Sequence, residues 1–354
     1  MRQGDTDLTD RFREPRSAQA VAAAIRARST RPIRLMEFCG GHTHAILRFG
    51  IPSLLPDTVD LRSGPGCPVC VTAAADLDHA IALAGIPDVI LTTFGDMIRV
   101  PGSRTSLAEA KAGGADVRVV YSPLDALQVA HQNPDRPVVF LGVGFETTAP
   151  MVASAVLSAD DDGLDNFYVF STHKLTPPAT LAILDAGEVA LDGVIGPGHV
   201  TTIIGSDAWR FLPETYDMGC AIAGFEPLDL LRAVLALVTM IEAGEADVNN
   251  AYARSVRPEG NTAAQEAIAQ VFDVADAEWR GFGTIPTSGL QVSARYGDYD
   301  ARRAFPLDIP PADEPRGCRC GDVLRGALLP PECALFGRAC TPQSPVGPCM
   351  VSAE

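Results

Sequence analysis

Nine cysteines carry most of the chemistry that this sequence offers, and the first of them opens the motif CGGHTH at residues 39–44. The motif follows an apolar run at residues 33–38, which is typical of a buried strand. Ligands of open α/β sheets bind at the carboxyl ends of strands, and a helix beginning after the glycines would favour the thiolate of Cys39. We therefore predict that Cys39, His42 and His44 contribute to a reactive or metal-binding site. The alternative is a small buried cysteine followed by two histidines that cap a helix.

The motif GPGCPVC at residues 64–70 contains a Cys-x-x-Cys pair, Cys67 and Cys70. This spacing suits either a dithiol/disulfide couple or half of a tetrahedral zinc site. A structural zinc would need a second pair nearby in the sequence, and no cysteine occurs between Cys70 and Cys220. We therefore favour a redox couple, or a pair that works together with Cys39, over two unrelated structural cysteines.

A third motif, GVGFETTAP at residues 142–150, also follows an apolar run and is expected to lead into a helix. It lacks the third glycine of a dinucleotide-binding fingerprint, so we exclude that function. Thr147 or Thr148 could cap the helix, which is the ordinary role of a threonine there. Glu146 comes soon after the strand end and could give or take protons beside the thiols.

The last part of the chain holds the remaining candidate ligands. Five cysteines lie there, separated by prolines and glycines: Cys318, Cys320, Cys333, Cys340 and Cys349. Four thiolates suffice for a zinc ion or a 4Fe-4S cluster. The irregular spacing lacks the paired Cys-x-x-Cys motifs of zinc ribbons, which favours the cluster, with zinc as the alternative. The fifth cysteine could serve as a nearby redox thiol, and the isolated Cys220 is interpreted as a core residue.

Alternating strands and helices are needed to position these motifs, and the sequence contains them. Apolar runs that we predict to be strands occur at residues 33–38, 89–93, 117–121, 138–143, 167–171 and 194–196. Ala- and Leu-rich segments that we predict to be helices include residues 17–27, 72–84 and 179–185. The alternation predicts an α/β fold in which helices cover parallel sheets.

Short motifs recur along the chain. GPGC at residues 64–67 is echoed by GPGH at residues 196–199, and GFE occurs at both 144–146 and 224–226. These echoes support two α/β halves of comparable size. Three further polar residues follow predicted strands and are interpreted as loop residues: His173, Lys174 and His199.

The length of 354 residues exceeds the ~250 residues at which one core usually stops growing, so we expect more than one domain. Pro134 and Pro137 surround a polar turn that separates two stretches of α/β pattern. We predict one α/β lobe at residues 1–133, a second at 134–226, and a third lobe at 227–354.

The third lobe has a different pattern. Its first part predicts helices and no strands, at residues 228–241, 246–255 and 263–272. From residue 304 onward the chain is rich in Pro, Gly and Cys. We interpret this tail as a small lobe held together by something other than a hydrophobic core.

The composition excludes several function classes. A net charge of -16 and a pI near 4.7 oppose binding to a phosphate backbone, so no nucleic acid partner is expected. The apolar segment at residues 228–241 is shorter than a membrane span and contains Asp229 and Arg232, so we expect no membrane partner either. Residues 1–16 lack the apolar core of a signal peptide, and we therefore expect a cytoplasmic protein. In that compartment the cysteines indicate metal binding or redox chemistry rather than disulfides.

Four motifs in this order resemble those of the HypD family of hydrogenase maturation factors: CGGHTH at 39–44, GPGCPVC at 64–70, GFETTAP at 144–150 and the cysteine-rich tail at 317–350. The resemblance implies an α/β fold with two Rossmann-like parallel-sheet lobes around a cleft. It also implies a mainly helical C-terminal lobe with a cysteine-bound 4Fe-4S cluster.

The resemblance further implies a function in building the Fe(CN)2CO unit of NiFe-hydrogenases. In that family the iron, which carries two cyanides and a carbonyl, is held between a cysteine of the chaperone HypC and the cysteine of CGGHTH, here Cys39. HypE delivers the cyanide, and the hydrogenase large subunit is the eventual recipient. Cys67 and Cys70 resemble the family's redox dithiol and belong to the implied iron site, and the cluster would relay or store electrons.

By their positions in the matched motifs, four further residues take implied catalytic roles: His42, His44, Glu146 and Thr148. The chain would then be a redox-active metallocofactor assembly protein, and the sequence does not decide whether it is an enzyme. A different class, a thiol-disulfide oxidoreductase resembling ferredoxin-thioredoxin reductase, would use Cys67 and Cys70 without iron at Cys39. A zinc-stabilised interaction module would leave the first three motifs unexplained.

Overall fold

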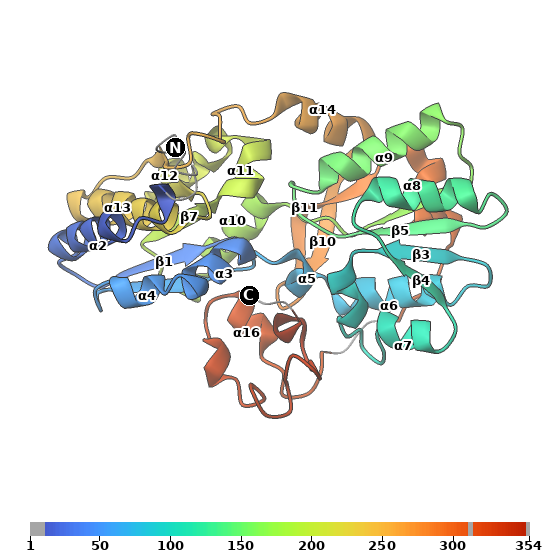
Figure 1. The fold of residues 1–354 in the computed structure, drawn as a ribbon, viewed down its shortest axis with the longest axis horizontal. Helices are drawn as coiled ribbons and strands as arrows, with labels where there is room; N and C mark the ends of the chain where they lie inside the picture. Colours follow the sequence, from blue (N-terminus) through green and yellow to red (C-terminus); the bar gives the residue numbers. More distant parts are fainter. Residues whose placement is uncertain (1–10, 311–313, 352–354) are drawn as a thin grey trace, which may run out of the picture. The chain divides into compact units, whose positions relative to one another are not determined.

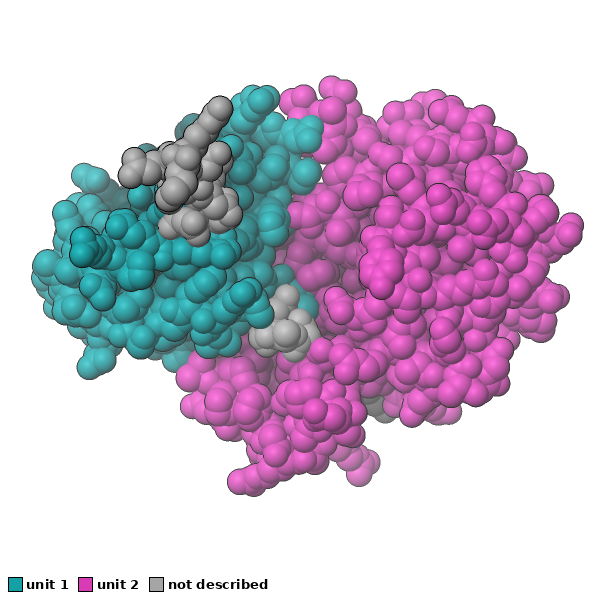
Figure 2. All heavy atoms as spheres, in the orientation of Figure 1, with its two compact units in different colours: residues 1–67, 183–261, 354 teal, residues 68–182, 262–353 magenta. Residues whose placement is uncertain are grey.

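Two compact units make up the part of the chain that the computed structural model describes, residues 11–310 and 314–351. Each unit is built on a parallel sheet with helices packed beside it (Figure 1). Of the described residues, unit 1 contains 11–67 and 183–261, and unit 2 contains 68–182, 262–310 and 314–351 (Figure 2). Both units are therefore assembled from segments that are far apart in the sequence.

The sheet of unit 1 has five parallel strands in the order β2-β1-β7-β8-β9. Its inner strands β7 and β8 are buried along their whole length, which explains their apolar sequences. The register places Leu35 of β1 beside Leu61 of β2 and Gly193 of β7. The strands are β1 (Ile33–Glu37), β2 (Val59–Ser63), β7 (Gly193–Pro197), β8 (Gly219–Ala223) and β9 (Val248–Asn250).

Helices α2 (Pro15–Arg28) and α13 (Pro227–Ala243) pack side by side in unit 1 and cover its core (Figure 1). α13 starts with a proline at its first turn and ends at Gly244, whose φ of 68° is the left-handed conformation favoured by glycine. Further helices of this unit are α3 (Gly40–Arg48), α4 (Ile51–Leu54), α11 (Gly198–Ile204) and α12 (Phe211–Tyr216). No helix in the described ranges is long and apolar enough to cross a membrane.

The sheet of unit 2 has four parallel strands in the order β4-β3-β5-β6. Figure 1 shows helices α6 and α7 on one face of this sheet and α8 and α9 on the other. Both faces are apolar, with Phe140 and Phe167 packed toward α9, and Leu91 and Leu141 packed toward α6. The elements are β3 (Ile90–Thr93), β4 (Asp116–Val119), β5 (Val138–Gly142), β6 (Phe167–Ser171), α6 (Ala74–Ala84), α7 (Leu107–Ala112), α8 (Pro123–Gln132) and α9 (Ala149–Asp161).

Residues 262–351 add a helix, a hairpin and the cysteine-rich tail to unit 2. Helix α14 packs against α9, and the antiparallel hairpin of β10 and β11 follows directly. The tail consists of short helices and turns. The elements are α14 (Thr262–Val271), β10 (Phe272–Trp279), β11 (Gly283–Val292), α15 (Ala301–Ala304), α16 (Cys320–Leu324) and the 3-10 helix Pro348–Met350.

The prediction that residues 227–354 contain helices and no strands is wrong. Strands β9, β10 and β11 all lie there, and the predicted helix at 246–255 is instead β9 followed by a turn. In β10 the register against β11 shifts between Ala275 and Ala277. This bulge interrupts the polar/apolar alternation by which a strand is recognised, and the Ala and Glu residues of the segment favour helix in isolation.

The prediction of an α/β fold with parallel sheets is confirmed, and every predicted strand forms. The compact units divide the chain differently from the predicted lobes at 1–133, 134–226 and 227–354. The sheet of unit 1 pairs β1 with β7, and the sheet of unit 2 pairs β3 with β5, so each sheet joins strands from the first two predicted lobes. Hydrophobic periodicity identifies strands but not the strands with which they pair, and for that reason it could not reveal this division.

The core of unit 1 provides a test of the fold. Leu237 on α13 is completely buried, whereas the side chain of Leu47 on α3 is exposed. We predict that Leu237→Ala lowers the free energy of unfolding by about 2–5 kcal/mol because it leaves a cavity. Leu47→Ala, the matched control, should change it by less than about 0.5 kcal/mol. Chemical denaturation of both variants makes the comparison, and equal effects would contradict the packing of α13.

Candidate functional site

Four neighbouring loops lie at one edge of the unit 1 sheet because four adjacent parallel strands end there. The loops carry GPGC after β2, CGGHTH after β1, GPGH across the end of β7, and GFE after β8. The two GPG motifs thus serve one sheet rather than two repeated halves. This edge is the place in unit 1 where the sequence motifs converge.

Cys39 is held at the start of α3 by its backbone. The buried carboxylate of Glu37 accepts a hydrogen bond from the Cys39 N–H at 2.7 Å and another from the hydroxyl of Thr43. The Gly40 N–H donates to the carbonyl of Gly66 at 3.0 Å, which joins the CGGHTH and GPGC loops. The thiol of Cys39 is partly exposed and lies at the positive end of the α3 dipole, which stabilises a thiolate.

Gly66 has no room for a side chain in this arrangement. A Cβ atom on Gly66 would lie 2.1 Å from the Cys39 nitrogen, so only glycine permits the contact. A Cβ atom on Gly41 would lie 3.0 Å from the Phe225 ring and 3.6 Å from the Cys39 sulfur. Gly66 is therefore required by close packing around Cys39, whereas a side chain at Gly41 would only press on the Phe225 ring.

An aromatic stack borders this thiol. The Phe225 ring lies 4.9 Å from the ring of His42 and 3.7 Å from that of His199. Nε2 of His42 donates to the carbonyl of Ala223 at 3.1 Å, while its buried Nδ1 has no hydrogen-bond partner within the described ranges. Burial lowers the pKa of His42 to about 4, so the ring is neutral at physiological pH.

His42 and His44 do not form a common site. Residues two apart on a helix point to opposite sides, and α3 buries His42 while the side chain of His44 is exposed. The sequence grouped these residues by proximity along the chain alone. The roles assigned to the two histidines stay predictions.

The Cys-x-x-Cys pair lies where the chain passes from unit 1 to unit 2, between Cys67 and Pro68. Both thiols are buried, and Cys70 belongs to the short helix α5 (Pro68–Val71). The Cys70 sulfur donates to the carbonyl of Pro348 at 3.8 Å. Pro348 begins the 3-10 helix that carries Cys349, so Cys70 lies directly against the cysteine-rich tail.

Three thiols of the tail are neighbours. The sulfur atoms of Cys320 and Cys349 are 2.7 Å apart, and Cys318 forms a hydrogen bond with Cys320. A Cβ atom on Gly347 would lie 2.4 Å from the Cys320 sulfur and 2.7 Å from the Cys318 sulfur, so glycine is required there too. The bond to Cys320, followed by burial, raises the pKa of the Cys318 thiol. A metal ion would therefore have to displace protons on binding.

The other cysteines are separate from this group. The Cys340 sulfur accepts a hydrogen bond from the Val346 N–H at 3.3 Å, and Cys333 ends a 3-10 helix. Cys220 is a core residue of β8, as the sequence predicts, and burial raises the pKa of its thiol. Within residues 11–310 and 314–351 no three His, Cys, Asp or Glu side chains are arranged to hold a metal ion.

Glu146 and Thr148 of the GFETTAP motif have structural partners. The buried Glu146 carboxylate accepts from the N–H and the hydroxyl of Thr176, each at 2.8 Å, at the start of α10 (Thr176–Ala186). Burial raises the pKa of Glu146 to about 7, against the opposing effect of these bonds. Thr148 stands before α9 but does not cap it, because its hydroxyl donates to the carbonyls of Val143 and Phe145. Catalytic roles for both stay predictions.

The sequence analysis did not identify two residues that lie beside Cys39, Glu37 and Phe225. Glu37 is a carboxylate at the end of β1, whose other buried residues are apolar, and such a residue signals a buried hydrogen-bond acceptor. Phe225 lies in the second GFE motif, so the repetition of GFE drew attention to this residue but did not indicate that it lies beside Cys39. Its distance of nearly two hundred residues from Cys39 in the sequence hides the contact.

The comparisons with known proteins all indicate the same family. The profile of the HypD family, whose description is "Hydrogenase formation hypA family", matches residues 16–354. Hydrogenase maturation factor HypD of Azotobacter vinelandii is 50% identical over 354 residues, covering 98% of this chain and 93% of the relative. The factors of that name from Rhodobacter capsulatus and Escherichia coli K12 are 46% and 45% identical, covering 97% and 98% of this chain and 94% and 95% of their own lengths.

The carboxyl group of Glu146 predicts a specific dependence of stability on pH. Its raised pKa means that the folded state binds a proton more tightly than the unfolded state, so stability should fall as the pH rises from about 4.5 to about 7. We predict that the free energy of unfolding of Glu146→Gln falls over this pH range by up to ~3 kcal/mol less than that of the unmodified protein. Denaturation of both proteins across this pH range measures the difference. Glu266→Gln, at an exposed position of α14, is the matched control and should leave the pH dependence unchanged.

Proposed function

This chain belongs to the HypD family, and from that membership we propose that it acts in hydrogenase maturation. In the finer form of the proposal, iron receives its cyanide and carbonyl ligands on this protein and a HypC-type chaperone before transfer to the hydrogenase large subunit. A HypE-type protein would donate the cyanide. The single observation that carries this proposal is the structure of the Cys39 loop, in which a hydrogen bond to Glu37 holds the backbone of a partly exposed cysteine.

Cys39 is the residue that we propose to bind the substrate iron. Its partial exposure leaves one side of the thiol open to a partner's ligand, and its position at the start of α3 favours the thiolate that binds metals. A soft thiolate suits iron that also carries cyanide and carbonyl. Neutral His42 and Phe225 offer an apolar wall beside the site, which limits access of water. Cys67 would assist from the GPGC loop, since Gly66 rests on the Cys39 backbone.

A 4Fe-4S cluster in the tail is the second part of the proposal. Thiolates are the usual ligands of such clusters, and the grouping of Cys318, Cys320 and Cys349 fits that donor set. Cys333 and Cys340 are the candidates for the remaining ligand, so four of the five tail cysteines would hold the cluster. When bound, the cluster supplies one-electron transfer. The same thiols would also suit zinc, which supplies none.

The Cys67 and Cys70 pair is proposed as the redox dithiol. Cys70 touches Pro348, whose neighbour Cys349 belongs to the thiol group of the tail, so electrons would have a short route between the two. This contact also favours the second candidate function, an iron-sulfur thiol-disulfide oxidoreductase. That function would need the pair and the tail but would not need Cys39.

The iron site is tested by infrared spectroscopy of the protein co-produced with its HypC-type partner and the cyanide-donating proteins. We predict cyanide and carbonyl stretching bands that are lost in Cys39→Ala, while the visible absorption of the tail cluster is kept. Cys220→Ala, which removes a core thiol, is the matched control and should retain both signals. Bands that persist in Cys39→Ala would contradict iron binding by this residue. Cluster absorption without bands in the unmodified protein would favour the oxidoreductase.

The dithiol is tested separately. We predict that Cys67→Ser and Cys70→Ser fold and retain iron in the tail but stop hydrogenase maturation, because the substitutions remove electron transfer and leave the tail thiols in place. Hydrogenase activity in cells that carry each variant, with iron and zinc analysis of the purified protein, makes the measurement. Normal maturation in either variant would exclude the pair as essential. Zinc instead of iron would exclude the cluster.

A further inference from the structure

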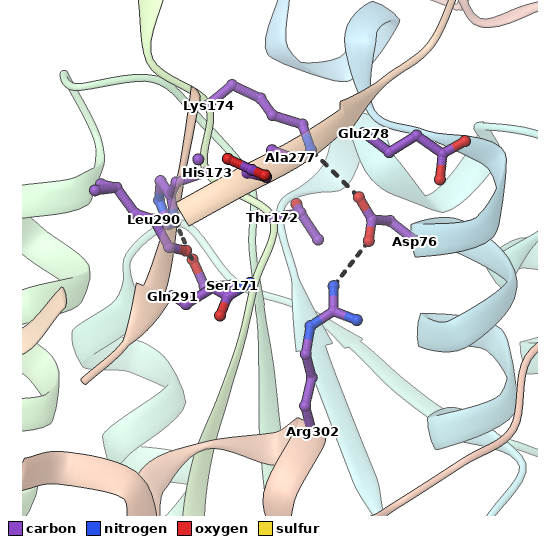
Figure 3. A pocket seen from close by; sticks show the side chains of 12 residues that line it. Asp76, Ser171, Thr172, His173, Lys174, Ala277, Glu278, Leu290, Gln291 and Arg302 are labelled. Carbon is purple, nitrogen blue, oxygen red and sulfur yellow. Dashed lines mark hydrogen bonds and ion pairs between the residues drawn. The ribbon is translucent and has the colours of Figure 1, made fainter. Parts of the chain in front are cut away.

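A polar cavity of about 220 Å³ lies in unit 2, beside the end of β6 and the β10–β11 hairpin (Figure 3). Its wall includes Asp76 from the first turn of α6, Lys174 from the loop after β6, and Arg302 from α15. The hairpin contributes Asp276 and Glu278. The cavity belongs wholly to unit 2, and neither the cysteine motifs nor the proposed iron site uses it.

Lys174 is an unusual residue for this chain. Only two of the 28 basic residues are lysines, Lys111 and Lys174, and the rest are arginines. The Lys174 side chain is 3% exposed, so this protein keeps one of its two ammonium groups almost fully buried. An ammonium is a compact charge whose three donors can turn toward different acceptors.

The Lys174 ammonium is incompletely paired. It donates one hydrogen bond, to Oδ2 of Asp76 at 3.3 Å, and makes no other within the ranges that the structure describes. Two of its three N–H donors are therefore left to the cavity. Buried donors without partners are costly, by ~1–3 kcal/mol each, so a ligand or ordered water must satisfy them.

Asp76 is shared with a second cation. Its other oxygen, Oδ1, accepts from Arg302 at 2.8 Å, while Oδ2 accepts the single bond from Lys174. Figure 3 shows Lys174 and Arg302 reaching Asp76 from two sides. The Arg302 guanidinium also lies over the Phe170 ring, 4.3 Å from its centre, which fixes its plane. One carboxylate is thus shared by two cations, and the inner wall has more donors than acceptors.

The hairpin adds two carboxylates to the lining. Asp276, Glu278 and Arg302 are all exposed, so solvent and salt screen their charges. One oxygen of Asp276 is also used, because it accepts from the Thr287 N–H at 2.9 Å. The lining carries no excess of positive charge, and the buried N–H groups of Lys174 are what a ligand would satisfy.

We propose that this cavity binds a small anion, a carboxylate or a phosphate-like oxyanion, between the Lys174 ammonium and the Arg302 guanidinium. Such a ligand would provide acceptors for the two N–H groups of Lys174 that are not bonded to Asp76. Burial lowers the pKa of Lys174, and a bound anion would oppose that shift, so binding would hold the amine protonated and less nucleophilic. This inference does not rest on the proposed function.

The binding itself is tested by calorimetry on the full chain with formate, acetate and inorganic phosphate, each against chloride at equal ionic strength. We expect saturable binding of one anion per chain, with a Kd of ~0.1–10 mM. Lys174→Met should weaken it by about tenfold or more, and Arg302→Gln should also weaken it, because each removes a charge-assisted bond. Lys111→Met, at an exposed helical position, is the matched control and should bind normally. Preference for formate and acetate would identify a carboxylate site, and preference for phosphate an oxyanion site.

Amine labelling provides a second measurement that does not depend on a variant. The described chain contains only two side-chain amines, so peptide mass spectrometry can follow Lys174 with Lys111 as an internal reference. The preferred anion should slow acetylation of Lys174 by about fivefold or more and leave Lys111 unaffected. The proposal is overturned if none of the three anions binds saturably, or if Lys174→Met binds them as tightly as the unmodified protein.

Discussion

The Cys39 site depends on the close packing of two loops, the one that follows β2 and the one that follows β1. A side chain on Gly66 would collide with the Cys39 backbone, and the Gly40 N–H closes the contact by bonding to the Gly66 carbonyl. This fixes the first motif on the second before any ligand is present. The backbone beside the Cys39 thiol is then held in place, which is the preorganisation that a metal-binding or reactive thiol needs.

Buried carboxylates act in a similar way in both units. Glu37 binds the Cys39 N–H in unit 1, and Glu146 binds the Thr176 N–H in unit 2. Each is a costly group to bury, and each is tolerated because it satisfies N–H groups that would otherwise be unpaired at a helix start. The motifs CGGHTH and GFETTAP thus have a structural reason for their composition in addition to any chemistry. That reason does not exclude a proton-transfer role for Glu146, whose pKa of about 7 would permit it.

The division of the chain between the units gives the Cys-x-x-Cys motif its particular setting. The chain leaves unit 1 after Cys67, and Cys70 then packs in unit 2 against the helix that carries Cys349. One motif therefore carries both the GPGC loop beside Cys39 and the contact with the cysteine-rich tail. Within unit 2, the hairpin of β10 and β11 serves both this region and the anion cavity, since the Arg280 N–H bonds to the Val71 carbonyl while Glu278 lines the cavity.

The sequence by itself determined the α/β class, the strands that precede CGGHTH and GFETTAP, and the core position of Cys220, because hydrophobic runs and glycine turns are local signals. It did not reveal β2, the strand before GPGCPVC. It could not determine strand order, the bulged hairpin, or the division into discontinuous units, since those depend on pairing between distant segments. Only the tertiary structure brought Phe225 to Cys39. It alone buried Lys174, 98 residues from Asp76 in the sequence, in a cavity that no motif marks. Such contacts depend on how residues that are far apart in the sequence pack together in the folded interior, and local sequence patterns do not contain that information.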